Sequence, residues 1–89
     1  MKLFINGRFL TQRITGVQRY AIEIIKSLDK LLDDEDEVTI LVPPESQVTF
    51  LELKKIKQKT VGVFKGHFWI QISLPRYVKK HRGNLLTFS

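Results

Sequence analysis

Residues 15–32 have the sequence TGVQRYAIEIIKSLDKLL, and this stretch decides how the chain folds. Its apolar residues recur at intervals of three and four, the spacing that places side chains on one face of a helix. They are Val17, Tyr20, Ala21, Ile24, Ile25, Leu28, Leu31 and Leu32. The expected polar face comprises Gln18, Arg19, Glu23, Lys26, Asp29 and Lys30. Thr15 and Gln18 have the spacing of a capping box, so we expect the helix to begin at Gly16.

Short apolar segments on either side of this helix predict strands. Residues 2–6 stop at an Asn-Gly pair, and residues 38–42 stop at a Pro-Pro pair. A weaker third strand is expected at residues 58–64, and a fourth strand is expected at residues 84–88. The acidic run at residues 33–37 opposes the helix dipole, which predicts a solvated turn after the helix.

Two further segments have mixed patterns. Residues 45–57 are ambiguous, and a short helix around residues 49–56 is one interpretation of this segment. Residues 66–82 follow a helical period but contain Pro75, which lacks an N–H and clashes with the preceding turn. We therefore expect two short helices that meet near residues 73–74, with Gly83 at the position after the second helix.

The order of these elements is strand, helix, strand, strand, helix, strand. This order predicts an α/β fold with a partial doubly wound parallel sheet of about four strands in the order 3-2-1-4, flanked by helices. The fourth strand would then be an apolar edge strand, and such strands pair readily with other chains. We therefore predict self-association through residues 84–88, and we interpret residues 1–89 as the N-terminal portion of a Rossmann-like domain.

Composition argues against several classes of protein. The chain has no cysteine and two widely separated histidines, so we expect neither a disulfide nor a metal site. No apolar run approaches the roughly 18 residues that span a bilayer, and the N-terminus lacks the pattern of a signal peptide. A cytoplasmic location is the corresponding expectation. Neither a GxGxxG fingerprint nor a P-loop is present.

The net charge of +6 is unevenly distributed. Residues 1–53 contain six Lys or Arg and nine acids, whereas residues 54–89 contain nine Lys or Arg and no acid. A basic half favours a polyanionic partner, such as nucleic acid or an anionic membrane surface, although a solvated face is an equal alternative. Trp69 fits either a membrane-surface element or a helix packed on the sheet, and we favour packing because the sheet needs a cover.

In an open α/β sheet, ligands bind at the carboxyl ends of the strands, where the strand order reverses. Here this place lies between the first and fourth strands, and the loop at residues 7–16 reaches it. The free N–H groups at the start of the long helix favour a phosphate or carboxylate. Gly16 would allow close approach, and Arg13 and Arg8 add positive charge. An ordinary strand-to-helix connection with a capping box explains the same residues.

Two motifs add a family resemblance. Residues 5–10 (INGRFL) and 13–21 (RITGVQRYA) resemble the N-terminus of the group 1 glycosyltransferases of the GT-B fold, in which a first strand leads to a helix start of the type TGVxRY. Residues 67–76 (HFWIQISLPR) resemble the helix that carries a W-E-Q-x-x-L-P motif in the same family. Ile70 stands where the family often has an acidic residue.

The resemblance implies part of an enzyme that transfers a hexose, with retention, from a nucleotide-diphosphate sugar to a saccharide or lipid-linked acceptor, without a metal or other cofactor. Thr15, Gly16 and Val17 would line the cleft near the diphosphate and the acceptor, and Arg13 would hold an anionic group. The nucleotide-binding domain of the family has no counterpart in this sequence, and no catalytic residue is identified. We therefore expect the isolated chain to be inactive. The alternative is a small basic module that binds nucleic acid or an anionic membrane, the latter at the inner face of the membrane.

Overall fold

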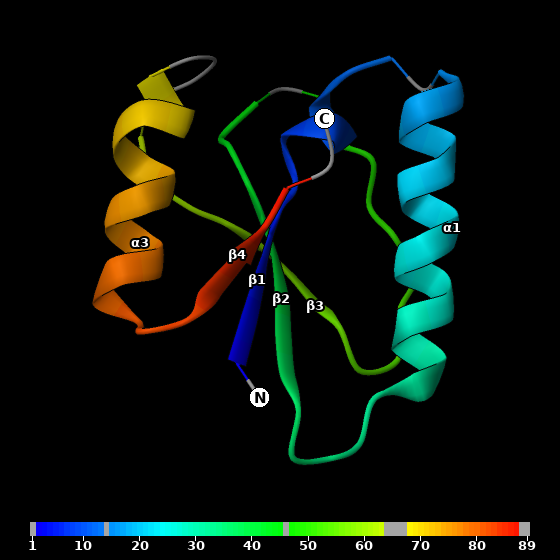
Figure 1. Ribbon diagram of the computed structural model, residues 1–89. Coiled ribbons are helices and arrows are strands. Elements are labelled where there is room, and N and C mark those ends of the chain that lie inside the picture. The colour runs from blue at the N-terminus through cyan, green and yellow to red at the C-terminus, as the bar shows by residue number, and fades with distance from the viewer. Residues whose placement is uncertain (1, 14, 46, 64–67, 88–89) are drawn as a thin grey trace.

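In the computed structural model of the chain, a four-stranded parallel sheet separates two helical layers (Figure 1). The structure describes residues 2–13, 15–45, 47–63 and 68–87. The elements, in chain order, are β1 (Lys2–Asn6), the 3-10 helix η1 (Arg8–Thr11), α1 (Gly16–Leu31), β2 (Glu37–Val42), β3 (Lys57–Thr60), the π-helix η2 (Trp69–Ser73), α3 (Leu74–Lys80) and β4 (Asn84–Leu86).

The strand order β3-β2-β1-β4, with every pairing parallel, confirms the predicted doubly wound sheet in the order 3-2-1-4. β1 lies in the middle, where Ile5 pairs with Ile40 of β2 on one side and with Leu86 of β4 on the other. β4 forms one edge of the sheet and β3 the other. The described β3 and β4 are shorter than expected, and the predicted ends at residues 64 and 88 lie outside the described residues.

α1 begins at Gly16 as predicted, but only part of its apolar stripe is buried. Ala21 and Ile25 pack on the sheet, whereas Val17, Tyr20 and Leu31 are exposed. The eight apolar positions span a wider arc of the helix than the sheet covers. Three of the eight apolar residues predicted to share one face of the helix therefore lie outside the core. The buried core on this side comprises Ile5, Phe9, Leu10, Ala21, Ile25, Leu32, Val38, Ile40, Val42, Leu51 and Ile56.

Asp29 is buried in this layer, which corrects the prediction that it belongs to the polar face of the helix. Its carboxylate accepts hydrogen bonds from three consecutive backbone N–H groups, those of Lys54, Lys55 and Ile56, each at 2.8 Å. Burial would raise the pKa of this carboxyl group, but the three hydrogen bonds and the charge of Lys54 together hold the pKa of Asp29 below its ordinary value. α1 is thereby attached to the segment that leads into β3.

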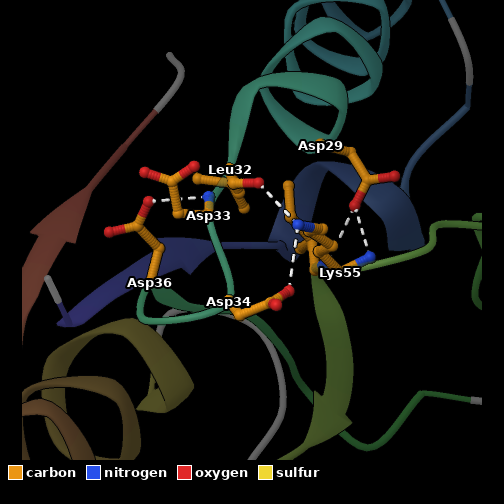
Figure 2. A network of polar contacts seen from close by, with 7 residues as sticks. Asp29, Leu32, Asp33, Asp34, Asp36 and Lys55 are labelled. Carbon is orange, nitrogen blue, oxygen red and sulfur yellow. Dashed lines mark hydrogen bonds and ion pairs between the residues drawn. The ribbon is translucent and has the colours of Figure 1, made fainter.

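The Lys55 side chain completes the same attachment (Figure 2). Its Nζ atom donates to the carbonyl of Leu32 at 2.8 Å, just after the end of α1, and lies 3.2 Å from a carboxylate oxygen of Asp34. The turn after α1 is closed locally, because the N–H of Asp33 donates to the side chain of Asp36 at 3.1 Å. Residues 49–56 contain no helix, so the interpretation of this segment as a short helix was wrong. These contacts hold the segment in an irregular conformation instead.

The second layer is built around Trp69, the first residue of η2, which is fully buried in a cluster with Phe4, Leu41, Val61 and Leu74. Its indole N–H donates to the carbonyl of Val61 at 2.8 Å. The rings of Tyr77 and of Phe4 in the sheet pack edge to face, with ring centres 5.5 Å apart and an angle of 80° between the ring planes. The two helices meet between Ser73 and Leu74, as Pro75 in the first turn of α3 predicts. The favoured interpretation of Trp69, packing on the sheet, is confirmed.

The end of α3 differs from the prediction in one detail. Arg82, and not Gly83, adopts the left-handed conformation after the helix, with φ of 53°. Gly83 is required for a different reason, since a Cβ atom there would lie 2.4 Å from a ring carbon of Phe4. The glycine therefore allows the chain to cross closely over β1 on its way to β4.

Candidate functional site

A crevice of about 310 Å³ opens where the carboxyl ends of β1 and β4 meet the start of α1. We call it the switch crevice, because the strand order reverses between β1 and β4. These ends lie together in the upper part of Figure 1. Its lining comprises Asn6, Arg8, Phe9, Gln12, Val17, Gln18, Ala21, Ile70 and Thr87.

The polar groups of the switch crevice are held by local hydrogen bonds. Asn6 is the last residue of β1 and is buried, and its Oδ1 atom accepts the backbone N–H of Arg8 at 3.1 Å. Gln18 donates from Nε2 to Oε1 of Gln12 at 3.2 Å. The Oε1 atom of Gln18 accepts the N–H of Thr15 at 3.2 Å, and also the Thr15 hydroxyl. The amide side chains are therefore oriented in the absence of a ligand.

The start of α1 retains free hydrogen-bond donors. The predicted capping box forms between Thr15 and Gln18, and the N–H of Thr15 donates to Oε1 of Gln18 at 3.2 Å. Within the described residues, nothing accepts a hydrogen bond from the backbone N–H of Gly16 or Val17. These donors and the positive end of the helix dipole favour an anionic or oxygen-rich group at this end of α1.

The four predicted binding residues do not form one site. Val17 lines the switch crevice, whereas Thr15 and Gly16 are exposed at the helix start and belong to no part of its lining. A Cβ atom at Gly16 would meet nothing within 4 Å, so packing does not require a glycine there. Arg13 borders a separate hollow of about 520 Å³, formed with Leu10, Thr11, Gln12, Gln47, Val48 and Thr49.

Sequence reasoning missed several residues that line the switch crevice. The sequence contains a signal for Asn6, since it is the polar residue that ends a buried strand at the reversal of strand order. It contains no such signal for Gln12 and Thr87, which lie in irregular segments. Ile70 was noted for the acidic residue that it replaces in the resembled motif, and its side chain now proves to form part of the crevice wall.

The lining determines which chemistry the crevice can perform. Two glutamines and one asparagine combine there with apolar walls, an arrangement that suits a ligand with hydroxyl groups and an apolar ring face. Arg8 is the ionisable residue of the lining, which includes no carboxylate and no histidine from the described part of the chain. The crevice can therefore bind and orient a ligand, but its described residues supply no general acid or base.

A second surface feature is defined by charge. The exposed cations of β3 and α3, which we call the basic face, are Lys57, Lys59, Arg76, Lys79 and Lys80. The ammonium group of Lys59 lies 5.6 Å from the centre of the Tyr77 ring and so connects the edge strand to the helix. Since Trp69 is buried, this face offers positive charge without the indole ring.

The fold and the crevice define a doubly wound α/β unit with a ligand-sized hollow at its switch point. Comparisons of the chain with protein-family models, with curated proteins and with solved structures found no match. No helix in the described part of the chain is long and apolar enough to cross a membrane. The described residues likewise contain no cluster of three or more side chains suited to bind a metal ion.

Proposed function

We propose that this chain is the acceptor-side part of a cytoplasmic GT-B glycosyltransferase, and that the switch crevice binds the sugar acceptor. The observation that carries the proposal is the convergence of the two motifs that resemble this family. Val17 and Gln18 from the first motif and Ile70 from the second line the same hollow, although some fifty residues separate them in sequence. A convergence at the switch point is what a shared binding role requires.

The chemistry of the crevice supports an acceptor more than a catalytic centre. Side-chain amides bind sugar hydroxyl groups as both donors and acceptors, and the apolar wall at Ile70 and Ala21 can pack against a pyranose ring. The donor in this family is a nucleotide-diphosphate sugar held by a second domain, so binding and not turnover is the property to measure in this chain.

The proposal is tested by titrating ¹⁵N-labelled protein with oligosaccharides and with a nucleotide-diphosphate sugar while recording amide NMR spectra. We expect saccharide-dependent shifts at the side-chain amides of Asn6, Gln12 and Gln18. The Gln18→Ala variant should weaken these shifts, whereas Lys26→Ala, a matched change farther along α1, should not. Absence of shifts at these amides with every ligand of either class would refute the proposal.

The basic face supports a second candidate, a module that binds anionic membrane surfaces. Five exposed cations lie on β3 and α3, and residues 54–89 contain no acid. Acids from elsewhere in the chain lie near one of the five, since Asp33, Asp34, Asp36 and Glu37 share a hollow with Lys57. Co-sedimentation with vesicles that contain phosphatidylserine, and not with neutral vesicles, is the expected result. The Lys79→Glu, Lys80→Glu double variant should lose binding, and Lys26→Glu on α1 is the control. Binding to DNA in place of vesicles would instead favour a nucleic-acid module.

A further inference from the structure

The outer face of α1 carries an apolar stripe that the sheet does not cover. Val17, Tyr20 and Leu31 are 56, 69 and 79% exposed, and Ile24 is half-buried. Together with Ser27, these residues occupy positions 17, 20, 24, 27 and 31, a spacing of three and four that repeats along the helix. This spacing is the seam of a two-helix coiled coil.

The seam is distinct from the face by which α1 already packs. Ala21, Ile25 and Leu32 are buried against the sheet, so the helix has apolar residues on two sides. From position 17 to position 31 the seam is about 21 Å long at the usual rise per residue. An apolar stripe of this length along a helix, rimmed by charged residues, is typical of a protein interface.

We propose that the seam docks against α1 of a second copy of this chain, with the two helices antiparallel. One register of such a pair places Tyr20 opposite the partner's Leu31, and Ile24 opposite the partner's Ser27. Two-fold symmetry repeats both contacts, so the same patch serves both copies. The two most exposed apolar side chains of the seam then cover each other.

Charge complementarity selects this arrangement. Glu23 and Lys30, both exposed, lie one heptad apart on the same flank of the seam, and the antiparallel register brings Glu23 of each copy beside the partner's Lys30. It also brings the five acids of residues 33–37 toward the positive start of the partner helix, near Arg19. A parallel pair would instead place two acidic turns side by side.

The seam is a stronger docking surface than the free edge of β4. β4 has only three residues, and its Leu85 and Leu86 are 41 and 37% exposed, much less than Tyr20 and Leu31. The proposal does not rest on the proposed function, although Val17 belongs both to the seam and to the lining of the switch crevice. We propose a second copy as the occupant because the charges beside the seam complement those of an identical seam that runs in the opposite direction.

Sedimentation velocity of the purified chain, from micromolar to millimolar concentration, tests the proposal. We expect a monomer–dimer equilibrium. The Tyr20→Ser, Leu31→Ser double variant should raise the dissociation constant by about a hundredfold, from the lost apolar burial. Gln71→Ser, an exposed and uncharged change on η2 outside the seam, should leave it unchanged. All of these positions are exposed, and Trp69 fluorescence will confirm that each variant is folded.

A charge swap tests the antiparallel register. Glu23→Lys should weaken the dimer by about tenfold, because two attractive pairs become repulsive. The double variant Glu23→Lys, Lys30→Glu should restore wild-type association. A monomer at every concentration would overturn the proposal. So would a dimer that tolerates the seam variants but is lost in Leu86→Lys, which would assign association to the edge of β4.

Discussion

Replacement of Asp29 should destabilise the protein more than any other change to a charged side chain. This carboxylate is buried and accepts three backbone hydrogen bonds of 2.8 Å from residues 54–56. Asp29→Ala removes all three acceptors at once. Asp29→Asn keeps one oxygen for the N–H groups of Lys55 and Ile56, but it turns an NH₂ group toward the N–H of Lys54.

The expected magnitude follows from these contacts. A hydrogen bond to a charged group contributes about 1.5–3 kcal/mol, and a donor left unsatisfied in the interior costs about 1–3 kcal/mol. The N–H groups of Lys54 and Lys55 belong to exposed residues and can regain water, whereas that of Ile56 is buried. We therefore expect Asp29→Ala to lower the free energy of unfolding by about 3 kcal/mol and Asp29→Asn by about 2 kcal/mol. A domain of this size has a total of roughly 5–10 kcal/mol.

Urea unfolding followed by the fluorescence of Trp69 measures this loss, because Trp69 is the single tryptophan and lies in the opposite layer. The matched control is Asp34→Asn. Its fully exposed carboxylate only pairs with Lys55 at the surface, so we expect a change below about 0.5 kcal/mol. An Asp29→Asn variant within that same margin of wild type would refute the assignment of Asp29 as a structural acceptor.

The pH dependence gives an independent check of the same residue. Because the pKa of Asp29 is lower in the folded protein than its ordinary value of 3.8, the carboxylate stabilises the fold fully above that value. The stabilisation is lost as the pH falls through the folded-state pKa. The difference in unfolding free energy between wild type and Asp29→Asn should thus be constant near neutral pH and shrink below 3.8.

Four further variants have expected outcomes that urea unfolding can measure. Gly83→Ala should cost about 1–3 kcal/mol because its Cβ collides with the ring of Phe4, whereas Gly16→Ala, which meets open space, should cost nothing or add up to about 1 kcal/mol. Trp69→Phe, followed by circular dichroism, should cost about 2 kcal/mol, because a buried carbonyl loses its indole donor. Arg82→Gly should raise stability by about 0.5–1 kcal/mol, since glycine adopts the left-handed backbone without strain. Equal losses in the two glycine variants would contradict the packing argument.

The sequence predicts the elements and the strand order of this fold because local patterns carry that information. The period of residues 15–32 defines α1, and Pro75 divides the helical segment where the structure divides it. The arc of α1 that meets the sheet depends instead on tertiary packing, which a helical period does not contain. Tyr20 and Ala21 are neighbours in the same pattern, yet one is exposed and the other buried.

Asp29 illustrates a second limit. Its partners are backbone N–H groups about 25 residues later in the chain. Every residue except proline has such a group, so the residue types at these positions do not indicate the contact. A charged residue within a polar helical face therefore looks the same whether it is solvated or buried. The location of the switch crevice follows from the strand order, so the sequence could predict it. The contributions of Gln12 and Thr87 to its lining could not be predicted, because both residues lie in irregular segments.

The position of Ile70 connects the resemblance to the chemistry of the site. In the resembled motif an acidic residue often occupies this position, and here the position lines the switch crevice. A carboxylate at residue 70 would share the lining with the side-chain amides of Gln12 and Gln18, and it could accept hydrogen bonds from the hydroxyl groups of a ligand or activate one of them. Isoleucine provides an apolar wall instead. Under the proposed function, the crevice would therefore bind its ligand by shape and by amide hydrogen bonds, and an acidic group for catalysis would have to come from outside its described lining.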